Sequence, residues 1–183
     1  MGCYWDNVPS DTLSKVAEKQ GLLSKIQNFF TLGYSTKEDL REQDKKLRDL
    51  YYDDLFLISG LWRDILLLII KGGYKDSNSD IKKVTQILGR LMEEVRHADY
   101  GYAGLMDRKG HIREIELTRV FDYDKTVGEA IEKLAKLSKT AFDCAEANNW
   151  TEAKNSIKSA REQILAIDEL WHKRERQFRP LDV

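Results

Sequence analysis

Residues 55–73, LFLISGLWRDILLLIIKGG, form the most apolar segment of the chain. Arg63 and Asp64 interrupt it. Its unbroken apolar run, Ile65–Ile70, is far shorter than the roughly 20 residues that a helix needs to span a bilayer. The paired glycines at its end are typical of a helix terminus. The segment therefore predicts the second half of a long helix that is buried in protein, and no membrane span is expected.

This predicted helix carries large apolar side chains on several of its faces. Leu40, Leu47, Leu61 and Leu68 share one heptad position, which gives one apolar stripe. Further apolar residues lie on the other faces: Phe56, Leu57, Leu66, Leu67 and Ile70. A helix that is apolar all round is normally buried on all sides. It is either the central helix of its own domain or a helix whose far face meets another chain.

Asp54 occupies the same heptad position as the four leucines. We expect it to be a buried carboxylate paired with a Tyr, Trp or Arg, or a polar residue that sets the register of the helix.

Helix boundaries are marked along the rest of the chain. Ser35–Glu38 and Thr126–Glu129 have the capping-box pattern, and Asn149–Glu152 is a looser version. Together with the apolar periodicity, these signals predict four long helices, at about 36–71, 79–106, 125–147 and 150–177. Residues 107–124 have no clean period and could be a short helix or an extended crossing segment. Two shorter helices are expected earlier, at about 10–20 and 22–31, with a break at Gly21.

The predicted fold is all-α: an antiparallel four-helix bundle at residues 35–183 with a short N-terminal helical extension at residues 1–34. A chain of 183 residues suits one domain with a small appendage. The composition, 42% apolar and 33% charged, is typical of long amphipathic helices.

Charge and cysteine content narrow the function. Lys and Arg total 30 against 31 for Asp and Glu, which argues against general nucleic-acid binding. Two cysteines are too few for a disulfide framework, and the segment MGCYWDNVPS has no apolar core of a secretory signal. A reducing, cytoplasmic compartment is therefore expected.

Two Glu-x-x-His pairs, Glu94–His97 and Glu169–His172, resemble half of the ligand pattern of ferritin-like di-iron bundles. Such ligands must point toward the bundle axis. Helical phase places Glu94 about 80° and His97 about 140° from the centre of their apolar stripe. Glu169 lies about 160° and His172 about 100° from theirs. We therefore expect these residues to face outward, and we expect no bound metal or other cofactor.

Arg90 and His97 stand on one helix with six residues between them. This pair resembles the Arg–His signature of the HEPN family of all-α domains, many of which are ribonucleases. The resemblance implies that His97 transfers protons and Arg90 binds phosphate at a dimer interface. The family usually has a polar residue directly after the Arg, whereas this chain has Leu91. In the alternative explanation, Arg90–Glu94 and Glu93–His97 are surface ion pairs one helical turn apart.

A second candidate surface lies in the stretch RHADYGYAGLMDRKGH, where Tyr100, Tyr102 and Arg108 combine aromatic and basic groups. The preferred interpretation is a non-enzymatic interaction or scaffold protein that self-associates as a homodimer or binds a protein partner. The alternatives are a HEPN-like ribonuclease using Arg90 and His97, and a di-iron protein using Glu94, His97, Glu169 and His172.

Overall fold

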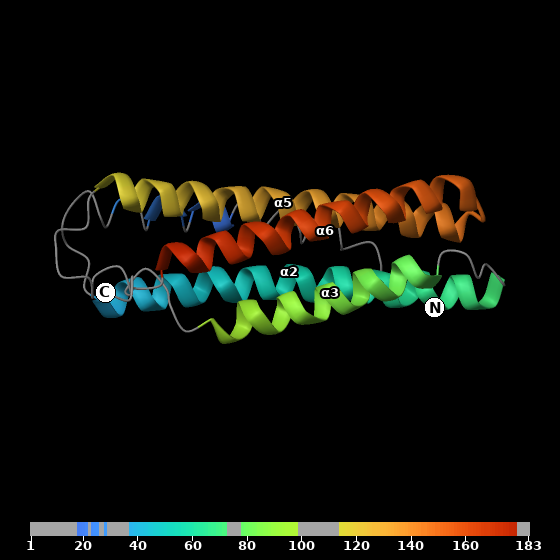
Figure 1. Ribbon diagram of the computed structural model, residues 1–183, viewed down its shortest axis with the longest axis horizontal. Coiled ribbons are helices and arrows are strands. Elements are labelled where there is room, and N and C mark those ends of the chain that lie inside the picture. The colour runs from blue at the N-terminus through green and yellow to red at the C-terminus, as the bar shows by residue number, and fades with distance from the viewer. Residues whose placement is uncertain are drawn as a thin grey trace.

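The computed structural model describes residues 18–21, 23–25, 28, 37–72, 78–98 and 114–178, and their regular structure is entirely helical. The all-α prediction is therefore confirmed. The long helices are α2 (Lys37–Gly72), α3 (Asn78–His97), α5 (Glu114–Glu146) and α6 (Trp150–Phe178) (Figure 1).

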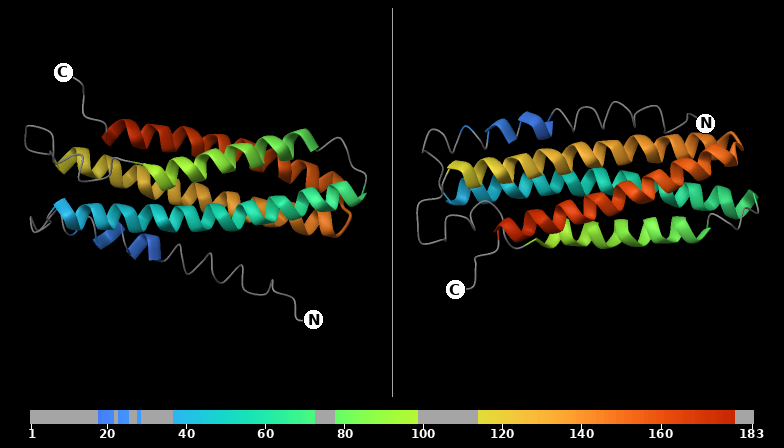
Figure 2. Two further views of the ribbon diagram at one scale, coloured as in Figure 1. Left: turned by 90° about the horizontal axis from the view of Figure 1, so that it is seen from below. Right: turned by 45° about the horizontal axis from the view of Figure 1, so that its top comes forward.

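The long helices lie side by side, and each runs opposite to the one before it (Figure 1). α2 packs against α3 and α5, and α6 packs against α5 and α3. The described N-terminal residues lie along the outside of α2 and α5 (Figure 2). A Cβ placed at Gly128 of α5 would be 3.8 Å from Cδ of Lys19, so this segment contacts the long helices directly.

The core is built from one stripe of each helix. α2 contributes large side chains at three- and four-residue intervals: Leu47, Tyr51, Leu55, Ile58, Trp62, Ile65 and Ile69. Trp62 is fully buried, and its indole Nε1 donates a hydrogen bond to Ser138 Oγ of α5 at 2.9 Å. Leu68, which the sequence places on the same apolar stripe as Leu47 and Leu61, is only partly buried. The buried stripe drifts away from it because an α-helix repeats every 3.6 residues rather than every 3.5.

The predicted ends of α2 and α6 lie within one residue of the observed ends. The predicted end of α5 also lies within one residue of the observed end, but its predicted start near residue 125 was wrong, because the helix begins at Glu114 and includes much of the stretch that lacked a period. Asp124 interrupts the apolar periodicity at the end of that stretch, since it is fully buried at an inward position where an apolar residue is expected. α3 ends at His97, and residues 99–106 of its predicted range lie outside the described residues. Gly21, the predicted break, is itself helical.

A tight turn joins α5 to α6. Asn148 has a φ of 58°, in the left-handed region, while its backbone N–H donates to the carbonyl of Ala145 at 3.1 Å. Asn149 then caps α6: its side-chain amide donates to Glu152 Oε2 at 2.8 Å. The backbone N–H of Glu152 returns a long contact of 3.5 Å to Asn149 Oδ1. The predicted capping pair Asn149–Glu152 is thus present.

Asn148 provides a test of the turn. Replacement by Ala should destabilise the protein by about 1–2 kcal/mol, because an L-residue with a Cβ is strained in the left-handed region and Asn tolerates it better than Ala. Replacement by Gly should change the free energy of unfolding by less than about 1 kcal/mol, since glycine adopts this conformation without strain. Urea denaturation measures both. Equal stability of the Ala and Gly variants would contradict the turn geometry.

Candidate functional site

Large apolar side chains on the outward side of α2 are exposed to solvent. The exposed fractions are 51% for Phe56, 53% for Leu67 and 63% for Ile70. Helical spacing places these three residues within an arc of about 60°, and we call them the α2 outer face. Leu57 and Leu66, predicted to belong to the same surface, are partly buried. The other predicted surface residues, Tyr100, Tyr102 and Arg108, lie outside the described residues.

Two further side chains extend the α2 outer face toward α3. The ring of Tyr52 stacks on Phe56, with 6.4 Å between centroids and 19° between planes. The guanidinium of Arg96 lies 5.4 Å from the centroid of the Tyr52 ring. An aromatic pair covered by an arginine is a common element of protein interfaces.

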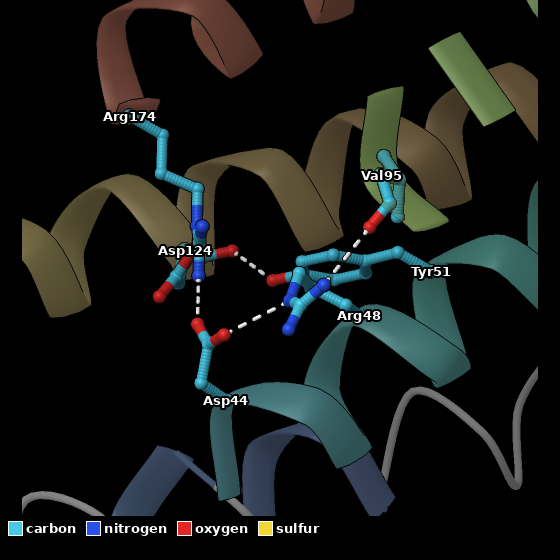
Figure 3. A network of polar contacts seen from close by, with 6 residues as sticks. All are labelled: Asp44, Arg48, Tyr51, Val95, Asp124 and Arg174. Carbon is cyan, nitrogen blue, oxygen red and sulfur yellow. Dashed lines mark hydrogen bonds and ion pairs between the residues drawn. The ribbon is translucent and has the colours of Figure 1, made fainter. Parts of the chain in front are cut away.

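A buried polar cluster joins all four long helices (Figure 3), and we call it the Arg174 network. Arg174 of α6 is fully buried; it donates through Nη2 to Asp44 Oδ1 at 2.6 Å and through Nε to Asp124 Oδ1 at 2.5 Å. Arg48 Nε donates to the second oxygen of Asp44 at 2.9 Å. Arg48 Nη1 also makes a long contact, 3.5 Å, with the carbonyl oxygen of Val95 in α3. The formal charges of the two aspartates and two arginines in the network sum to zero.

Tyr51 completes the Arg174 network. Its hydroxyl donates to the main-chain carbonyl of Asp124 at 2.7 Å. Burial, followed by the nearby charge of Asp124, raises the pKa of the Tyr51 phenol well above its usual value. The Tyr51 phenol is therefore neutral at neutral pH and remains so above pH 10, where a free tyrosine ionises.

Asp54 is buried, as predicted, but the observed partner is Lys19 rather than a Tyr, Trp or Arg. The ammonium of Lys19 also lies 5.3 Å from the centroid of the Tyr51 ring. Lys19 is itself buried, so the N-terminal segment supplies a cation to the interior. The sequence could not identify this partner, because 35 positions separate the two residues.

The Arg174 network is expected to be sensitive to removal of its central cation. Arg174→Met should destabilise the protein by about 3–5 kcal/mol, because Asp44 and Asp124 would lose a buried partner. Chemical denaturation measures the change. A Lys173→Met variant, which removes a neighbouring half-buried cation paired with exposed Glu169, should cost less than about 1 kcal/mol. Similar losses in both variants would contradict a special role for Arg174.

Tyr51 predicts a component of the alkaline stability profile. A raised pKa in the folded state means that the unfolded chain ionises first, so stability falls as the pH rises above about 10. Tyr51→Phe should cost about 1 kcal/mol near neutral pH through the lost hydrogen bond. It should also lose less stability than the parent above about pH 10. Parallel alkaline profiles for parent and variant would count against a neutral, buried Tyr51.

At the contact between α3 and α6, Glu94, Asp168 and His172 form the α3–α6 cluster. One ligand-type atom from each residue lies within 4.8 Å of the others. Arg90 binds the outer side of the cluster: Nη2 donates to Asp168 Oδ2 at 2.7 Å, and Nε lies 3.6 Å from Glu94 Oε1. Sequence reasoning missed Asp168. Its signal was the Asp168–His172 spacing of four residues, which places both on one helix face.

The four residues of the di-iron pattern do not come together. His97 Nε2 lies 3.2 Å from Glu93 Oε2, and both side chains are about two-thirds exposed or more. Glu169 pairs with Lys173 at 2.7 Å, and hydrogen bonding to this lysine lowers the pKa of the exposed Glu169 carboxyl. The helical phase therefore correctly predicted that His97 and Glu169 face outward. Glu94 and His172, about 80° and 100° from their stripes, sit at the flank where the two helices meet.

The HEPN-like pair is also divided between different partners. Arg90 binds Asp168 and Glu94, whereas His97 is held by Glu93. The alternative explanation of this pair as members of surface ion pairs one turn apart is therefore the one that the contacts match.

Within the α3–α6 cluster, two carboxylate oxygens are buried and have no hydrogen-bond partner among the described residues: Glu94 Oε2 and Asp168 Oδ1. Burial raises the pKa of the Glu94 carboxyl, while the charges of His172 and Arg90 oppose that rise. The cluster thus presents two acceptor atoms that receive no hydrogen bond from the described residues.

Comparison of the chain with models of protein families, with curated proteins and with solved structures finds no match. None of the helices in the described part of the chain combines the length and apolar character that crossing a bilayer requires.

Proposed function

We propose that the chain is an antiparallel four-helix bundle that acts as a non-enzymatic interaction or scaffold protein and self-associates through the α2 outer face. The reversal of direction between successive helices and the ring of contacts α2–α3–α6–α5 support the bundle. Among the described residues, the inner stripes of the long helices form the core, whereas Phe56, Leu67 and Ile70 on the outward side of α2 remain exposed.

The exposure of Phe56, Leu67 and Ile70 is the observation that carries this proposal. Full burial of one such side chain contributes roughly 1.5–3 kcal/mol. Three half-exposed side chains on one arc, extended by the Tyr52–Phe56 stack, therefore offer enough apolar area for the centre of an interface. The sequence left two explanations open for this helix, a central core helix or a helix whose far face meets another chain, and the exposed residues favour the second.

The proposed partner is a second copy of the chain. The α2 outer face lies on one long helix, so two copies can bring the same surface together about a two-fold axis. The adjacent Arg96 and the exposed acid Asp53 provide opposite charges near the rim. Cys144 is a free thiol, which fits the proposed reducing, cytoplasmic compartment.

The enzymatic alternatives have less support. In a nuclease, the Arg must neutralise charge on a phosphate close to the catalytic His. Arg90 is instead engaged by two carboxylates, and His97 faces Glu93. The ligand set of a di-iron site is divided between the α3–α6 cluster and exposed surface pairs.

Sedimentation velocity over a micromolar concentration series tests the proposal. The parent chain should sediment as a dimer. Leu67→Lys combined with Ile70→Lys should shift the dimer toward monomer by at least about 100-fold in Kd, since two apolar anchors would be replaced by charges. Leu165→Lys is the matched control, because Leu165 is 46% exposed but lies on α6.

The control should remain dimeric. A monomeric parent at all concentrations, or loss of the dimer in the Leu165 variant but not in the Leu67/Ile70 variant, would overturn the proposed interface.

A further inference from the structure

We propose that Glu94, Asp168 and His172 bind one divalent transition-metal ion, with Zn²⁺ as a suitable member of the class. Two carboxylates and an imidazole are a ligand set that such ions accept. The imidazole distinguishes this set from the all-oxygen sites that Mg²⁺ and Ca²⁺ prefer. The site differs from the di-iron pattern read from the sequence, because Asp168 takes part and His97 and Glu169 do not.

The geometry of the α3–α6 cluster is close to that of a metal centre. Zinc binds imidazole nitrogen and carboxylate oxygen at about 2.0–2.2 Å in tetrahedral geometry, so two ligand atoms on one ion lie about 3.4 Å apart. One ring nitrogen of His172 and one oxygen each of Glu94 and Asp168 lie within 4.8 Å of one another, so the side chains would rotate inward to bind one ion. Asp168 and His172 are one turn apart on α6, and Glu94 approaches from α3. Two packed helices therefore hold the ligands in place before the ion arrives.

Two carboxylate oxygens without a hydrogen-bond donor among the described residues give a second, independent observation. Glu94 Oε2 and Asp168 Oδ1 are buried atoms that accept no hydrogen bond from the described residues. Buried acceptors normally have a partner, which is a protein group, an ordered water molecule or a bound ion. A cation bound between these two oxygens would supply that partner.

The His172 ring is prepared for metal binding by its own helix. Its Nδ1 lies 2.7 Å from the main-chain carbonyl oxygen of Asp168. In the neutral ring, Nδ1 therefore carries the hydrogen and donates it to this carbonyl, which leaves the lone pair on Nε2. A metal-binding histidine typically donates its other ring N–H to a carbonyl or carboxylate in this manner. The side chain is 45% exposed, so an ion and a completing water molecule can reach it.

Arg90 is compatible with the proposed ion but weakens its binding. It uses Oδ2 of Asp168 and approaches Oε1 of Glu94, which are the other oxygens of the two carboxylates. The guanidinium thus orients both ligands from the outer side. Its positive charge also repels a cation, so the site is expected to bind zinc in the micromolar range rather than as tightly as a structural zinc site.

Isothermal titration of untagged, chelator-treated protein with Zn²⁺ tests the proposal, and Co²⁺ gives an independent absorption signal. The parent should bind about one equivalent per chain. His172→Ala, Glu94→Gln and Asp168→Asn should each weaken binding by at least about tenfold. Far-ultraviolet circular dichroism establishes that each variant is folded, and the exposed His172 makes that variant the safest.

His97→Ala and Glu169→Gln are the matched controls, because they alter the other members of the two Glu-x-x-His pairs at exposed positions. They should bind zinc like the parent. Absence of saturable binding below millimolar Zn²⁺, or equal loss of binding in the His97 and His172 variants, would overturn the proposal.

Discussion

The structure depends on a buried network of ion pairs centred on Arg174. Arg174 is inaccessible to solvent near the end of α6, and its guanidinium is shared by Asp44 of α2 and Asp124 of α5. A charge in the interior is unfavourable unless its partners are in the right place. The helices must therefore pack in the register that brings residues 44, 124 and 174 together. We infer that apolar packing drives the association of the helices, while the Arg174 network selects this arrangement among those with similar apolar contact.

Much of this fold was predictable, and the failures have a common cause. Apolar periodicity located α2 and α6 to within a residue, because their inward positions are filled mainly by apolar side chains. It failed for the first part of α5, where Asp124 occupies an inward position. Asp54 could be recognised as an exception on its stripe, but its partner Lys19 could not. Polar pairs far apart in sequence leave no periodic signal, so they become visible only when the helices are assembled.

The two candidate sites also differ in how far the sequence alone could identify them. Apolar patterning on one helix assigned five residues to the outer side of α2, and of these Phe56, Leu67 and Ile70 are exposed, whereas Leu57 and Leu66 are partly buried. The α3–α6 cluster requires knowledge of which helices are neighbours. Phase placed Glu94 and His172 roughly at right angles to their stripes. A side chain at that angle is either a surface residue or a partner of the adjacent helix, and only the contact of α3 with α6 decides between them.

Arg174 and its two aspartates are expected to act as one unit, and a double-mutant cycle measures their coupling. Asp44→Asn, Arg174→Met and the combined variant would be compared with the parent by chemical denaturation. The account predicts a coupling free energy above about 1.5 kcal/mol, because either single change leaves the other group with an incomplete buried partner set. Additive effects, within about 0.5 kcal/mol, would contradict the proposed role of the Arg174 network.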